Sequence, residues 1–138
     1  MENEKRKFTH FKIHTQYSIC EGAIKITDLG KYCKENKTQA IGLSDSFNLC
    51  GALEFSEEIS KSGTQPIIGT QINFIFNKVM GKIPIFAQTK KGFSNLTKLS
   101  SKSYLDVNEN LPPHCNLDEL FLHSEDIIVT SGGSVSYT

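Results

Sequence analysis

The stretch that decides the fold is AIGLSDSFNLCGALEFSEEISKSGTQPIIGTQINFIF, residues 40–76. It opens with a short apolar strand over residues 40–44 and continues into a helix over residues 51–61, with apolar side chains at i, i+3 and i+7. A second strand follows over residues 66–76. A strand, a helix and a strand joined by short loops predict two parallel strands, with the helix crossing one face of the sheet.

The same alternation of strands and helices extends on both sides of this stretch. It predicts an α/β fold in which helices cover a mainly parallel sheet. The further predicted strands cover residues 8–13, 83–87 and 126–130, and the strand at residues 83–87 is expected to form a hairpin with the strand before it. The further predicted helices cover residues 27–36 and 91–104. A short helix is expected to begin at Asn116, because Asn116 and Glu119 match a capping box.

The spacing of the strands indicates that the 138 residues are part of a larger barrel. Each predicted strand–helix unit takes about 28 residues, close to the roughly 31 of an eight-unit barrel. The last strand is followed directly by Ser131-Gly132-Gly133, without the crossover helix that would cover its face. We therefore expect residues 1–7 to be a charged tail and residues 8–138 to be the truncated N-terminal part of one domain.

Composition excludes several classes of protein. The chain has 15 basic and 15 acidic side chains, and Arg6 is its single arginine, so a dedicated nucleic-acid groove is not expected. The sequence contains neither an 18-residue apolar run nor a signal peptide, which predicts a cytoplasmic protein. The four cysteines form no Cys-x-x-Cys pair, which argues against a zinc knuckle.

The first predicted strand carries polar side chains on one face. Because side chains alternate along a strand, His10, Lys12 and His14 share a face, whereas Phe11 and Ile13 are expected to face the helices. In barrels of this kind, functional side chains collect where the strands end. We therefore expect a polar cluster at one mouth of the barrel.

Two interpretations of this cluster stay open on the residues alone. Carboxylates and imidazoles could bind a metal, with His14, Glu21, Asp45 and His10 as candidate ligands. An ammonium at Lys12 would repel that metal. The favoured interpretation is a hydrogen-bonded structural cluster in which Lys12 pairs with Asp45 or Glu21.

Five segments carry a resemblance to a known family, in its order and at its spacing. Together they resemble the polymerase-and-histidinol-phosphatase (PHP) domain at the N-terminus of the bacterial DNA polymerase III alpha subunit. The segments are residues 8–18 with Glu21-Gly22-Ala23, residues 40–55, residues 65–69, residues 91–101 and residues 123–128.

The resemblance implies a distorted, incomplete TIM-like (βα)7 barrel with a metal cluster at its mouth in active members. At the matching positions, however, this chain has lost most of the ligands, which implies a degenerate site without catalytic residues or an expected metal. The positions that match ligands of the family and keep a possible ligand are His14, Glu21 and Asp45. The other matching positions have lost theirs: Lys12 replaces the first His of a His-x-His pair, Ser46 the His of Asp-His, Gln71 a Glu, Lys82 a His and Gly133 a Cys.

The resemblance also implies a role in DNA replication. The full-length family is a DNA-directed DNA polymerase, a nucleotidyltransferase that uses Mg²⁺ bound by carboxylates far beyond Thr138. For this segment it implies a structural role, supporting the polymerase core and docking the proofreading exonuclease subunit, with DNA contacted mainly elsewhere. The alternatives are a metal-dependent PHP phosphoesterase and an alpha-subunit paralogue of error-prone repair synthesis.

Overall fold

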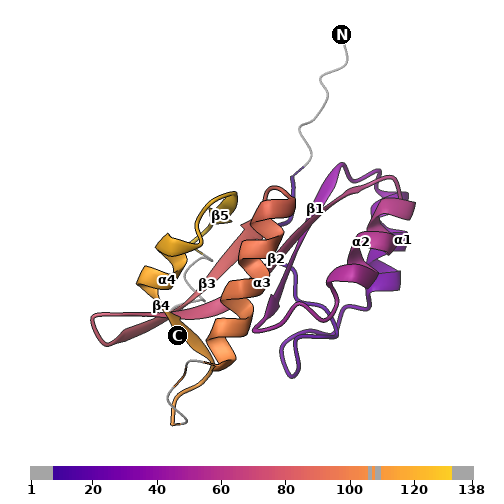
Figure 1. Cartoon of the computed structure of the whole chain (residues 1–138). Helices are drawn as coiled ribbons and strands as arrows, with labels where there is room; N and C mark the ends of the chain where they lie inside the picture. Colours follow the sequence, from indigo (N-terminus) through magenta and orange to yellow (C-terminus); the bar gives the residue numbers. More distant parts are fainter. Residues whose placement is uncertain (1–7, 106, 108–109, 132–138) are drawn as a thin grey trace.

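Figure 1 shows the computed structural model, which describes residues 8–105, 107 and 110–131. These residues form one five-stranded sheet in which four strands follow the order β1-β2-β3-β5, while β4 pairs with β2. The strands are β1 (Ala40–Ser46), β2 (Gln65–Phe76), β3 (Val79–Ala87), β4 (His114–Asn116) and β5 (Ile127–Val129).

Four of the five strands run in the same direction. β1 pairs in parallel with the first half of β2, and β4 pairs in parallel with its second half. β3 alone is reversed, because it returns from β2 through a tight turn at Asn77-Lys78, where both residues adopt positive φ. β5 is antiparallel to β3 and so restores the common direction. The mainly parallel sheet and the predicted hairpin are confirmed.

The helices cover one face of this sheet (Figure 1). One core cluster joins the first two helices to β1 around the fully buried Phe55, and the other joins the last two helices to β2 and β3 around Leu96 and Leu99. The opposite face, called the inner face here, carries polar side chains such as Gln71, Asn73 and Lys82 together with the ring of Phe86. The helices are α1 (Ile26–Glu35), α2 (Ala52–Lys61), α3 (Lys90–Leu105) and α4 (Leu117–Leu122).

The predicted strand over residues 8–13 is wrong as a regular strand, although this segment does lie beside β1. The carbonyl oxygens of His10 and Ile13 accept the N–H groups of Gly42 at 2.7 Å and Ser44 at 2.9 Å. In a regular parallel ladder the two accepting residues would be two apart, whereas here they are three apart. One extra residue is therefore accommodated as a bulge.

This bulge changes the direction of Phe11. Its ring meets the ring of Phe86 with centroids 5.6 Å apart, on the sheet face opposite the helices. The main chain of Phe11 lies so close to Gly42 that a Cβ there would be 2.7 Å from the Phe11 carbonyl oxygen. The expectation that Phe11 faces the helices is thus wrong, whereas Ile13 packs against the α1–α2 core as predicted.

Two further details differ from the sequence prediction. Strand β4 occupies residues for which the sequence predicts no strand, and it pairs with the end of β2. The capping box is wrong: the Asn116 side chain makes no cap hydrogen bond to α4, and Glu119 instead pairs with Lys102 at 2.8 Å. None of the helices formed by the described residues is long and apolar enough to cross a membrane.

Candidate functional site

The candidate site is built on a tight turn over residues 15–22, which lies against the end of β1. The turn is closed by N–H groups of Glu21 and Gly22, both of which donate to the Ser18 carbonyl oxygen at 3.0 and 2.9 Å. A Cβ on Gly22 would lie 2.1 Å from the Thr15 carbonyl oxygen, so only glycine fits this close approach. An isolated bridge between Thr15 and Ile24 fixes the base of the turn.

Asp45, near the end of β1, is the anchor of this turn. Its side chain is 1% exposed and accepts three hydrogen bonds. The Thr15 N–H donates at 2.6 Å, the Thr15 hydroxyl at 2.7 Å and the Ser18 hydroxyl at 2.7 Å. Three donors at these distances compensate the burial of this carboxylate.

Ser18 connects this anchor to the strand end. While its hydroxyl donates to Asp45, the same oxygen accepts the N–H of Ser46 at 3.0 Å. The Nδ1 atom of His14 lies 3.4 Å from that oxygen. Through this one hydroxyl, the turn is hydrogen-bonded to the side chain of Asp45 and to the main-chain N–H of Ser46.

Glu21 receives the second set of contacts. Its Oε2 atom accepts a hydrogen bond from the Ser46 hydroxyl, and its Oε1 atom lies 3.0 Å from the Lys82 ammonium. The Ser46 hydroxyl is the main cause that lowers the pKa of Glu21 below its usual value, and Lys82 acts in the same direction. The carboxylate is thus held in its charged form.

Lys82 reaches Glu21 from the inner face of β3, where it is opposite Asn73 of β2. Its ammonium also lies 4.9 Å from the centroid of the Phe47 ring, a cation–π contact. Phe47 adopts a positive φ of 62°, unusual for an aromatic residue, and its N–H donates to the Gln71 carbonyl oxygen at 2.9 Å. The contacts of Lys82 thus join β3 to the turn and to the end of β1.

His14 and Lys12 lie at the rim of this network. Nδ1 of His14 is 4.0 Å from Glu21 Oε2, and its side chain is 22% exposed. Burial lowers the pKa of His14 below its usual value, against the opposing effects of Glu21 and Asp45. Lys12 is exposed, and its charge also lowers the pKa of His14.

Gln71 completes the inner face next to Ser46. The two residues are directly opposite in the β1–β2 register, and Gln71 is 1% exposed. Its side-chain nitrogen has no hydrogen-bond partner among the residues that the structure describes. Gly133, the remaining position at which the resemblance implies a ligand, lies outside the described residues.

The structure thus brings together six of the predicted site positions: His14, Glu21, Asp45, Ser46, Gln71 and Lys82. The Lys82 ammonium lies 3.0 Å from Glu21, and the donors to Asp45 include the side chains of Thr15 and Ser18. Sequence reasoning gave neither of those residues a role. The available signal was weak: two hydroxyl residues three apart in a turn near an acidic strand end.

These residues do not suit the metal cluster that the family resemblance implies. Across residues 8–105, 107 and 110–131, no group of three or more His, Cys, Asp or Glu side chains could hold a metal ion. Asp45 already accepts three protein hydrogen bonds, and an ammonium lies 3.0 Å from Glu21. A divalent cation would have to displace these contacts.

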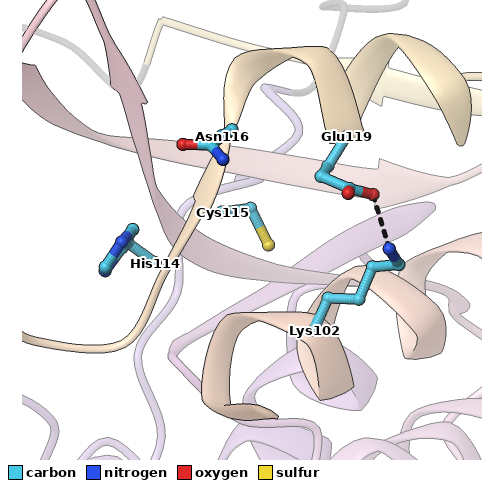
Figure 2. A pocket seen from close by; sticks show the side chains of 5 residues that line it. All are labelled: Lys102, His114, Cys115, Asn116 and Glu119. Atoms are coloured by element: carbon cyan, nitrogen blue, oxygen red, sulfur yellow. Dashed lines mark ion pairs between the residues drawn. The ribbon is translucent and has the colours of Figure 1, made fainter. Parts of the chain in front are cut away.

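A second polar hollow lies between α3, β4 and α4, away from this network. Figure 2 shows Lys102 and Glu119 facing each other across it, with their ion pair at 2.8 Å. The cavity has a volume of about 40 Å³, room for about one water molecule. His114 and Cys115 point to opposite sides of β4 (Figure 2), as adjacent residues of a strand must, so they do not converge on one ligand.

Comparison with known proteins identifies the family. The model of the PHP domain matches residues 10–137. The chain belongs to the PHP domain family. Its fold is similar to the crystal structure of a protein from Bifidobacterium adolescentis assigned as a metal-dependent phosphoesterase, with a TM-score of 0.54, 15% sequence identity and coverage of 69% of this chain and 32% of that one.

Curated relatives of this PHP chain are DNA polymerase III alpha subunits. The chain is 38% identical to the Caulobacter vibrioides subunit over 95% of its own length, 33% identical to that of Haemophilus influenzae over 93%, and 35% identical to that of Helicobacter pylori over 97%. It spans only 11–12% of the length of these relatives. The predicted family and PHP-type fold are confirmed.

Proposed function

We propose that this chain is the N-terminal PHP segment of a bacterial DNA polymerase III alpha subunit and that it serves DNA replication as a structural and docking module. The names of its relatives support this assignment, as does the match along more than nine-tenths of the chain. In this proposal, residues 8–138 are the first part of the PHP domain, preceded by a tail at residues 1–7.

The observation that carries the structural role is that donors of the protein itself already contact both carboxylates of the site. Asp45 is held by Thr15 and Ser18, and Glu21 by Ser46 and Lys82. We assign no catalytic residue to this segment. The proposed vestigial positions of the metal site are Lys12, His14, Glu21, Asp45, Ser46, Gln71, Lys82 and Gly133.

The chemistry and the partners of the full-length subunit lie mostly elsewhere in this proposal. Deoxynucleotide addition would use Mg²⁺ held by carboxylates in another domain, which would also make most contacts with DNA. The PHP segment would support that polymerase core and dock the proofreading exonuclease and other replicase subunits. A cytoplasmic location follows from this role in replication.

Two measurements on the purified full-length subunit test the proposal. Elemental analysis is expected to find no stoichiometric zinc or manganese, and a phosphate-release assay no activity dependent on either ion. Stoichiometric metal together with phosphate release would replace the proposal with the phosphoesterase alternative. In a pull-down, deletion of the PHP segment is expected to abolish capture of the exonuclease subunit, and retained capture would refute the docking role.

A further inference from the structure

Lys82 is unusual because it brings a positive charge to a place where the family resemblance implies a metal ligand. Its side chain comes from the inner face of β3 and is 26% exposed, and Glu21 is 40% exposed. A protonated amine cannot ligate a metal, and it repels one. Lys82 therefore does not merely leave the metal site incomplete but places a cation in it.

The two carboxylates of the network are stabilised in different ways. Asp45 is contacted by neutral donors, the amide and hydroxyl of Thr15 and the hydroxyl of Ser18. Glu21 accepts a hydrogen bond from the neutral Ser46 hydroxyl and pairs with the Lys82 ammonium at 3.0 Å, with His14 farther away at 4.0 Å. The Lys82 ammonium thus contacts Glu21, the carboxylate that a metal would contact in an active site.

The position of the Lys82 ammonium is defined on two sides. Glu21 lies at 3.0 Å on one side, and the Phe47 ring lies with its centroid at 4.9 Å on another. Phe47 is itself fixed, because its N–H donates to Gln71 and its carbonyl oxygen accepts the Tyr104 hydroxyl at 2.7 Å. A long, flexible side chain is thereby given a defined place for its charge.

We propose that the Lys82 ammonium is a built-in replacement for a metal ion. It neutralises Glu21 and so keeps the turn at residues 15–22 closed over the end of β1 without any bound metal. This inference rests on the proposed structural role, since it explains how a degenerate PHP site stays ordered. It assigns to Lys82 a positioning role, exerted through Glu21.

The test is hydrogen–deuterium exchange, read by mass spectrometry, on the full-length subunit. In Lys82→Met, amides of peptides covering residues 15–22 and 44–48 are expected to exchange about three- to tenfold faster. Added Mn²⁺ is expected to leave exchange unchanged in both proteins, because neither has a set of side chains that could hold a metal among the described residues. Lys91→Met is the matched control, because it removes a lysine paired with Glu125 at 2.6 Å on the outer surface.

Two further variants keep the test informative if Lys82→Met folds poorly. Lys82→Arg retains the charge and is expected to keep the wild-type protection. The double variant Glu21→Gln/Lys82→Met removes the charge that needs neutralising, so it is expected to exchange more slowly than Lys82→Met. A double variant as unprotected as Lys82→Met would overturn the proposed neutralising role.

The remaining outcomes separate this inference from the proposed function. Unchanged exchange in Lys82→Met would overturn the role of Lys82 and leave the structural function standing. Exchange in Lys82→Arg as fast as in Lys82→Met would show that a positive charge at this position does not keep the turn closed, and would overturn the replacement role. Stoichiometric manganese in the wild type, with slower exchange of residues 15–22, would overturn both.

Discussion

Replacing Asp45 with alanine is the sharpest single test of the network at the end of β1. The change leaves three donors without their acceptor: the Thr15 N–H, the Thr15 hydroxyl and the Ser18 hydroxyl. Each buried donor left unpaired costs about 1–3 kcal/mol, and removing one partner of a buried charged network typically costs about 3–5 kcal/mol in all. Since both hydroxyls can rotate toward other acceptors, we expect about 3–4 kcal/mol, the lower part of that range.

The loss can be measured locally in the full-length subunit. The Ser46 N–H donates to Ser18, so its exchange reports the opening of the turn. A loss of about 3 kcal/mol corresponds to exchange roughly 100-fold faster or more. Asp45→Asn, which keeps one oxygen acceptor, is expected to lie between Asp45→Ala and the wild type.

The control is Asp28→Ala, which removes an exposed carboxylate paired with Lys31 at 3.4 Å. An exposed pair of this kind contributes about 0–1 kcal/mol, so exchange at Ser46 should stay at the wild-type rate. If Asp45→Ala raised that rate no more than Asp28→Ala does, the three hydrogen bonds would not stabilise the turn, and the account of the site would be refuted.

Three further predictions concern the core, the docking of α3 and the effect of pH. Phe55→Ala removes a fully buried ring between α1, α2 and β1 and is expected to destabilise the domain by about 3–5 kcal/mol, measured as faster exchange throughout α2. In Gly92→Ala, the new Cβ would lie 2.1 Å from the Asp126 carbonyl oxygen, so the domain should unfold at a lower temperature. Gly81→Ala is the control: a Cβ there has open space around it, so the unfolding temperature should stay nearly unchanged. Burial lowers the pKa of His14 below 6.5, so below that pH the unfolded chain binds a proton that the folded chain does not. The stability contributed by neutral His14 is therefore complete above pH 6.5 and is lost as the pH falls through the lowered pKa. His14→Gln should remove that part of the pH dependence of the free energy of unfolding. The same dependence on pH in His14→Gln and in the wild type would contradict this prediction.

The regular part of the fold was predictable because its signals are local. The helix over Ala52–Lys61 and the strands on either side of it follow from apolar spacing, and the structure places each within a few residues of the prediction. The first segment failed for a non-local reason. Its alternating pattern is that of a strand, but the contact of Phe11 with Phe86 and the space beside Gly42 allow a bulge that no local pattern encodes.

The candidate site was predictable in its membership and not in its pairing. Strand ends on one side of a parallel sheet must meet, which is sufficient to bring Glu21, Asp45 and Ser46 together. Which donor reaches which carboxylate depends on side-chain directions within the turn, and the pattern of residues in a turn does not determine these. Thr15 and Ser18 were therefore missed, although they are the side chains that hydrogen-bond to Asp45.

The depth of each carboxylate accounts for the kind of partner it has. Asp45 is 1% exposed, and an ion pair at that depth would require a second charge to be taken out of water, which can cost more than the attraction returns. Neutral hydroxyl and amide donors stabilise Asp45 without that cost. Glu21 is 40% exposed, so a lysine can neutralise it while staying partly hydrated. A divalent cation entering this site would have to break the hydrogen bonds to the buried Asp45 and displace the Lys82 ammonium from the partly exposed Glu21. Both obstacles to metal binding are side chains or main-chain groups of this chain.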